Sequence, residues 1–131
     1  MSPRPLLSLL LALGLWAGCS SQPTPEELAG EAAKEYYERL AAGDCEAFLS
    51  GRADAELLPA DYRRQLLQVC EQYVRQQEKS HGGIASVVLS SARRDTLQHL
   101  TQAFLLLTFR DSVCEEIVVP MIECNGQWRM K

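Results

Sequence analysis

Apolar residues recur at three- and four-residue steps along the first part of the chain, from about residue 24 to residue 81. This spacing places one apolar stripe on each helix and predicts three helices. Thr24 and Pro25 suit the cap and first position of the first helix, and Gly43 suits its end. The second helix starts at Asp44 and stops at Gly51. The third covers 59–81 and stops at the glycine pair 82–83.

The pattern changes after residue 83 to short segments rich in β-branched and aromatic residues. These segments predict four strands, at 84–92, 97–110, 114–124 and 128–131. The connecting turns are expected at 93–96, 111–112 and 125–126, and Asn125-Gly126 is the strongest hairpin signal because both residues tolerate positive φ. We therefore expect an α+β fold in which the helices pack on a curved antiparallel sheet of about four strands.

A separate apolar run, Leu6–Trp16, precedes the first helix and follows Arg4. Its eleven residues have the length of a signal-peptide core, whereas a membrane-spanning helix needs about 20. The sequence Leu15-Trp16-Ala17-Gly18-Cys19 resembles the lipobox of bacterial lipoproteins. The resemblance implies cleavage between Gly18 and Cys19, acylation of Cys19, and outer-membrane sorting because Ser20 is not acidic.

These features divide the chain into a lipoprotein signal peptide at 1–18, a lipidated cysteine with a short tether at 19–23, and one domain at 24–131. The whole chain has 131 residues, 47% of them hydrophobic, which leaves room for a single globular domain. Its net charge of −4 lacks the basic footprint of a nucleic-acid-binding protein. We therefore expect a lipid-anchored protein of the bacterial cell envelope with no nucleic-acid partner.

Two stretches resemble the nuclear transport factor 2-like (NTF2-like) superfamily, which includes ketosteroid isomerases and is also called the cystatin-like α+β cone. Residues 33–44 (AKEYYERLAAGD) with Phe48-Leu49 resemble its opening helices, and 116–122 with 125–131 (NGQWRMK) resemble its closing strands. The ending is especially similar to small bacterial lipoproteins with a lumazine-binding-like domain of unknown function. The similarity covers about residues 26–131 and implies the fold, because this fold hosts enzymes, binding modules and assembly domains alike.

Candidate catalytic groups are few. His99 is expected in the second strand and Asp61 at the start of the third helix, and no Asp/His pair at a telling spacing supports a general base. The helices carry four tyrosines that are mostly core candidates: Tyr36, Tyr37, Tyr62 and Tyr73. Their hydroxyls could line a small pocket, for which we single out Tyr36, Tyr62 and Tyr73 together with His99. No glycine-rich phosphate loop or nucleophile motif is visible, and we expect no cofactor.

Four cysteines remain if Cys19 is acylated. Cys114 and Cys124 fall on one predicted strand, where ten residues span about 33 Å, far beyond the roughly 7 Å limit between disulfide α-carbons. We favour a Cys45–Cys70 disulfide, and crossed pairings from the helices to the strand stay open. The spacing of the cysteines does not predict a metal site.

The sequence leaves three functions open. The leading hypothesis is a noncatalytic module that binds a small apolar ligand or an envelope protein. The second is an isomerase- or dehydratase-like enzyme that uses His99 or Asp61 with a tyrosine. The third is a homodimeric assembly domain, since both faces of the middle strands are largely apolar.

Overall fold

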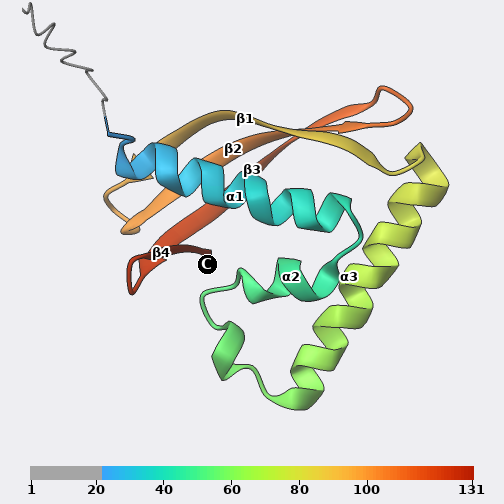
Figure 1. Ribbon diagram of the computed structural model, residues 1–131, viewed down its shortest axis with the longest axis horizontal. Coiled ribbons are helices and arrows are strands. Elements are labelled where there is room, and N and C mark those ends of the chain that lie inside the picture. Colours follow the sequence, from blue (N-terminus) through green and yellow to red (C-terminus); the bar gives the residue numbers. More distant parts are fainter. Residues whose placement is uncertain (1–21) are drawn as a thin grey trace, which may run out of the picture.

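A computed structural model describes residues 22–131 (Figure 1). The predicted signal peptide 1–18, the cleavage position at Gly18 and the acylated Cys19 lie outside the described residues. The helices are α1 (Pro25–Ala41), α2 (Cys45–Ser50), the 3-10 helix η1 (Ala55–Leu57) and α3 (Ala60–His81). The strands are β1 (Ile84–Asp95), β2 (Leu100–Phe109), β3 (Cys114–Cys124) and β4 (Gln127–Met130).

The helix ends follow the predicted capping chemistry. Thr24 Oγ1 accepts a hydrogen bond from the backbone N–H of Glu27 at 3.2 Å, and Asp44 caps α2 through the N–H of Ala47 at 3.1 Å. Gly82, directly after α3, has φ +75°, a backbone conformation that side chains with a Cβ rarely adopt. The predicted starts and ends of the three helices are confirmed to within a residue or two.

The strands form one antiparallel meander in the order β1-β2-β3-β4, as predicted. Asn125 and Gly126 both have positive φ, at +51° and +79°, and form the β3–β4 hairpin turn. The α+β prediction, with helices packed on a curved four-stranded sheet, is confirmed.

The first turn of the sheet differs from the prediction. β1 continues to Asp95, and Arg93 and Arg94 pair with β2 instead of forming the turn. Asp95 starts the turn, because its Oδ1 accepts hydrogen bonds from the N–H groups of Leu97 at 3.0 Å and Gln98 at 3.2 Å. The prediction that the second strand includes His99 is therefore wrong: this residue lies in the turn with φ +54°.

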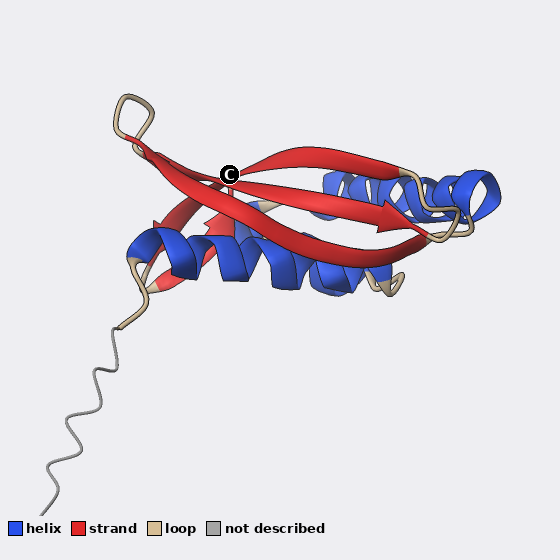
Figure 2. Ribbon diagram, turned by 90° about the horizontal axis from the view of Figure 1, so that it is seen from above, coloured by secondary structure: helices blue, strands red, loops and turns tan. Residues whose placement is uncertain are grey.

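The hydrophobic core lies between α1 and the inner face of the sheet (Figure 2). Ala29 and Ala33 of α1 are fully buried, and their small side chains let the helix approach the strands closely. The largest fully buried apolar side chains come from the strands: Leu105, Leu107 and Met121. The main core cluster runs from Ala29 to Met130, so the described residues hold a complete core of their own.

The long helix α3 contributes much less to the core. Cys70 is its only buried residue, in a small cluster with Leu40 and Cys45. Figure 1 shows α3 running away from the sheet from its C-terminal end, with α2 between its middle and α1. Within residues 22–131, no helix combines the length and apolar character needed to cross a membrane.

Candidate functional site

A cavity of about 450 Å³ occupies the space between the three helices and the inner face of β2 and β3. Its wall is mostly apolar, with a few polar side chains. The lining residues are Tyr37, Leu40, Phe48, Leu49, Arg52, Leu66, Val69, Cys70, Tyr73, Leu107, Glu115 and Ile117. A cavity of this size with an apolar wall and a few polar groups has the character of a small-molecule site.

Tyr37 enters the cavity from α1. Its ring packs edge-to-face on Phe48 of α2, with ring centroids 5.2 Å apart, and this contact restricts the position of the hydroxyl. Burial raises the pKa of Tyr37 above its ordinary value of 10.0, and neighbouring Tyr73 raises it further. The hydroxyl therefore stays protonated at neutral pH and can donate a hydrogen bond.

Tyr73 faces the same cavity from α3. Burial is the main cause that raises its pKa above 10.0, and the negative charge of Glu115 on β3 adds to the shift. Two phenols, the exposed carboxylate of Glu115 and the guanidinium of Arg52, which pairs with Asp54 at 2.9 Å, thus line an apolar space. This set can donate and accept hydrogen bonds, while the carboxylate, being open to solvent, lacks the burial that would prepare it as a general base.

The cavity wall includes one member of the predicted disulfide. Cys70 of α3 lies against Cys45 at the start of α2, and both thiols are buried and free in this structure. Burial, with a hydrogen bond to Cys45, raises the pKa of Cys70 from 9.0 to about 12. The structure thus brings the two predicted partners together as thiols. Cys114 and Cys124 both lie on β3, as expected, and are free as well.

The four residues expected to line one pocket are not brought together. Tyr73 lines the cavity, but the Tyr36 hydroxyl points to another side of α1 and donates to the carbonyl of Trp128 at 2.9 Å. Tyr62 is 45% exposed near the start of α3. Tyr37, a candidate that is not among the four residues singled out, does line the cavity, and its three-residue step to Leu40 places both on the same helix face.

Neither candidate catalytic residue lies at the cavity. His99 is exposed in the β1–β2 turn and borders a separate hollow of about 200 Å³ beside Trp128. Asp61 is exposed in the first turn of α3, 3.5 Å from Arg64. Since a general base must reach a proton of its bound substrate, these positions give no support to an enzyme that works in the cavity.

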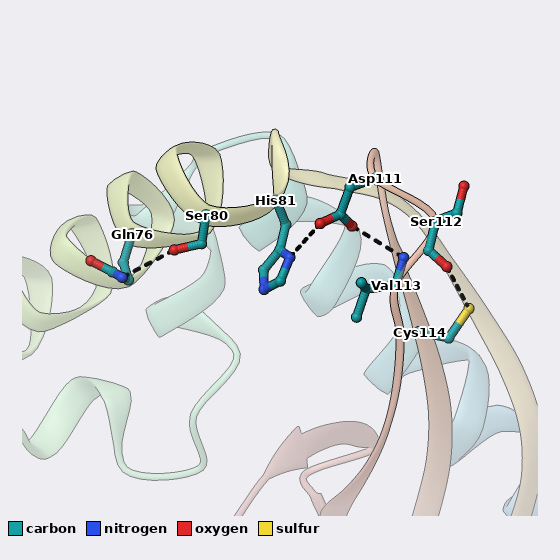
Figure 3. Close-up of polar contacts among 7 residues, drawn as sticks. All are labelled: Gln76, Ser80, His81, Asp111, Ser112, Val113 and Cys114. Carbon is teal, nitrogen blue, oxygen red and sulfur yellow. Dashed lines mark hydrogen bonds and ion pairs between the residues drawn. The ribbon is translucent and has the colours of Figure 1, made fainter.

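His81, which the sequence places at the end of the third helix, forms an ion pair across the fold. Its Nδ1 lies 2.6 Å from Asp111 Oδ2 in the β2–β3 turn, and Asp111 Oδ1 accepts from the N–H of Val113 (Figure 3). The hydrogen bond from His81 lowers the pKa of Asp111 below 3.8. The pair is outside the cavity and ties the end of α3 to the sheet.

A metal centre is not evident in the described part of the chain. No three His, Cys, Asp or Glu side chains within residues 22–131 lie close enough together to hold a metal ion. The chemistry that the polar side chains of the cavity offer is the donation and acceptance of hydrogen bonds.

Comparison with known proteins supports the fold. A scan against protein-family models found no match, and a search of curated proteins found none. Among solved structures, this chain is similar to a Campylobacter jejuni protein named as a putative NTF2-like transpeptidase, with a TM-score of 0.62. The two are 14% identical over 76% of this chain and 94% of the other. Together with the helices and the four-stranded curved sheet, this likeness shows that the described residues form a domain with the NTF2-like fold.

Proposed function

We propose that this chain is a lipid-anchored envelope protein whose cavity binds a small, largely apolar ligand without converting it. The observation that carries the proposal is the apolar cavity of about 450 Å³ into which Tyr37 and Tyr73 present phenol groups. Its volume falls in the range of cavities that hold small molecules. The ligand has an apolar body and at least one polar group.

The placement of the polar groups defines the ligand further. Tyr37 and Tyr73 remain protonated at neutral pH and offer donors to a carbonyl, ether or hydroxyl oxygen. Glu115 offers an acceptor at the solvent-exposed side of the cavity. A ligand with an oxygen acceptor near the two phenols and a donor near Glu115 satisfies these three groups, while Arg52, which also lines the cavity, is paired with Asp54 at 2.9 Å.

The binding proposal is tested with the neutral fluorescent probe N-phenyl-1-naphthylamine, whose emission rises in apolar surroundings. Val69 lines the cavity from α3 and is 62% exposed, so Val69→Trp narrows the cavity without disturbing the core. Val118 is 50% exposed on β3 but faces away from the cavity, and Val118→Trp is the matched control. We expect probe affinity to fall by about tenfold in the first variant and to stay unchanged in the control.

Two outcomes decide the proposal. Equal affinity in the two tryptophan variants places the probe elsewhere and overturns cavity binding. Tyr73→Phe removes one hydroxyl and keeps the ring, so a native ligand with a matching oxygen, identified by mass spectrometry of the purified protein, binds this variant more weakly. The anchor is tested separately, by the intact mass of protein purified from bacterial membranes beside Cys19→Ala.

Self-association is a second candidate, favoured by the outer face of the sheet. Val88 and Val118 are about half exposed there, and the registers place them beside Leu106 and Phe104. No described element covers this apolar face. Light scattering distinguishes the two: a dimer that becomes monomeric in Val118→Lys supports assembly, and a wild-type monomer excludes it.

A further inference from the structure

One end of the domain carries an unusual surface residue. Leu97, in the β1–β2 turn, is 91% exposed and is the most exposed of the large hydrophobic side chains in the described residues. An exposed leucine of this kind gains free energy when it enters an apolar medium. The turn that holds it is well defined, because Asp95 accepts hydrogen bonds from the N–H groups of Leu97 and Gln98.

Two arginines lie just behind this leucine. Arg93 and Arg94 are exposed near the end of β1, and neither forms an ion pair with another described residue. Arg93 instead packs over the ring of Phe104, with its guanidinium 5.3 Å from the ring centroid. An apolar tip with basic residues a few positions behind it matches the depth profile of a lipid surface, where acyl chains lie beneath phosphates.

The start of the domain lies at the same end. Figure 1 shows the start of α1 and the β1–β2 turn at the same end of the sheet, with the β2–β3 turn at the opposite end. Figure 2 shows that the β1–β2 turn projects away from α1, on the other side of the sheet. A Cβ on Gly30, in the first half of α1, would lie 2.8 Å from the Leu89 side chain and 3.3 Å from Ala92, so this half of the helix packs closely on the second half of β1. Four residues lie between Cys19 and Thr24, and the five Cα–Cα steps that join them can span at most about 18 Å.

We propose that the β1–β2 turn is a second membrane contact, in which Leu97 enters the lipid interface and Arg93 and Arg94 bind anionic phosphate headgroups. This inference rests on the proposed anchor at Cys19, because one leucine and two arginines alone bind lipid weakly. Glu26 and Glu27, in the first turn of α1, repel the same headgroups. The turn itself has one carboxylate, Asp95, whose Oδ1 accepts hydrogen bonds from the backbone N–H groups of Leu97 and Gln98. With two arginines against this one carboxylate, the turn rather than the helix end lies against the bilayer and fixes the orientation of the domain.

The test measures depth in the membrane with tryptophan fluorescence. Protein purified from bacterial membranes is reconstituted into vesicles of phosphatidylethanolamine and phosphatidylglycerol containing brominated acyl chains, which quench tryptophan on contact. Leu97→Trp is compared with Val113→Trp, an exposed position in the turn at the opposite end of the sheet. We expect brominated lipid to quench the first by about half and to leave the second at the wild-type value set by Trp128.

A charge variant tests the arginines. Arg93→Glu/Arg94→Glu in the Leu97→Trp background reverses the attraction and is expected to lower the quenching at least about twofold. Arg75→Glu/Lys79→Glu makes the same charge change on exposed positions of α3 and leaves the quenching unchanged. Equal effects of the two pairs show that net charge alone matters and overturn the assigned headgroup contact.

The outcomes separate this inference from the anchor itself. Acylated Cys19 with no quenching at position 97, or with equal quenching at 97 and 113, overturns the membrane contact and leaves the anchor intact. Unmodified Cys19 overturns the anchor. In that case the same variants are held on nickel-chelating lipid by a hexahistidine tag that replaces residues 1–19, because residues 22–131 contain the complete core. The absence of quenching there also overturns the contact.

Discussion

The two long helices bury their apolar stripes to very different extents. α1, with 17 residues, buries Ala29, Gly30, Ala33 and Leu40, whereas α3, with 22 residues, buries Cys70 alone. Alanine and glycine on α1 allow the helix to pack directly on the sheet. α3 carries larger side chains toward the same sheet, and the cavity lies between this helix and strands β2 and β3. Helical periodicity thus predicts a stripe but does not predict what covers it.

The largest expected effect comes from placing a charge on each stripe. Ala33→Asp puts a carboxylate at a fully buried position against the sheet and is expected to lower the free energy of unfolding by more than about 4 kcal/mol. Val69→Asp changes a side chain on the stripe of α3 that is 62% exposed. It is expected to change the free energy of unfolding by no more than about 0.5 kcal/mol. Urea denaturation followed by circular dichroism measures both.

Similar losses in these two variants would contradict the contrast between the helices. They would mean that the stripe of α3 is covered in solution, either by closure of α3 onto the sheet or by a second molecule. A size measurement by light scattering at the same protein concentration distinguishes closure from association.

The sequence predicts local features of this fold better than distant ones. Thr24, Asp44 and Asn125-Gly126 act within a few residues of themselves, so the helix starts and the last hairpin could be predicted. The first turn is predicted at 93–96 but lies at 96–99, because β1 pairs with β2 through Asp95, whose side chain then accepts hydrogen bonds from the backbone of the turn. The cavity depends on the angle between α3 and the sheet, which no local pattern encodes, and so the sequence does not tell which of the adjacent Tyr36 and Tyr37 lines it.

A second prediction concerns the link between α2 and α3. If Cys45 and Cys70 become a disulfide, the bond closes a loop of 26 residues and is expected to stabilise the domain by about 3 kcal/mol relative to the dithiol. The bond would fix α3 at its only buried position and so hold the cavity wall. Urea unfolding with and without reductant measures the difference, and Cys45→Ser/Cys70→Ser should show none.

In the reduced protein, the reactivity of the thiols tests whether α3 stays packed against α2 at Cys70. With a pKa of about 12, Cys70 is almost entirely protonated at pH 8, and burial limits access to it. Cys114 is exposed and is expected to react with iodoacetamide much faster. Rapid labelling of Cys70 in folded, reduced protein, located by peptide mapping, would show that α3 detaches readily from the rest of the fold.

A smaller effect is expected on the side of α1 that faces β4. A Cβ on Gly51 would lie 2.5 Å from the Tyr36 ring, too close for any real contact. Gly51→Ala therefore displaces the ring, weakens the bond from its hydroxyl to Trp128, and is expected to cost about 2 kcal/mol of unfolding free energy. Tyr36→Leu makes room for the methyl group, so the loss on adding Gly51→Ala should be smaller in that background. Additive losses would disprove the steric cause.

The smallest effect tests the ion pair that ties the end of α3 to the sheet. Because His81 lowers the pKa of Asp111 below 3.8, the carboxylate contributes stability that is complete above that value and is lost as pH falls through the lower, folded-state pKa. Asp111→Asn keeps an oxygen acceptor for the N–H of Val113 but removes the titrating group. The drop in Tm between about pH 5 and about pH 2.5 should therefore be smaller in Asp111→Asn than in the wild type. Superimposable pH profiles would show that the pair contributes nothing in solution. The end of α3 would then be held to the sheet by other contacts, among them the backbone hydrogen bonds from Arg110 to Gly83 and from Asp111 to His81 and the packing of the His81 ring on Phe109, with ring centroids 5.0 Å apart.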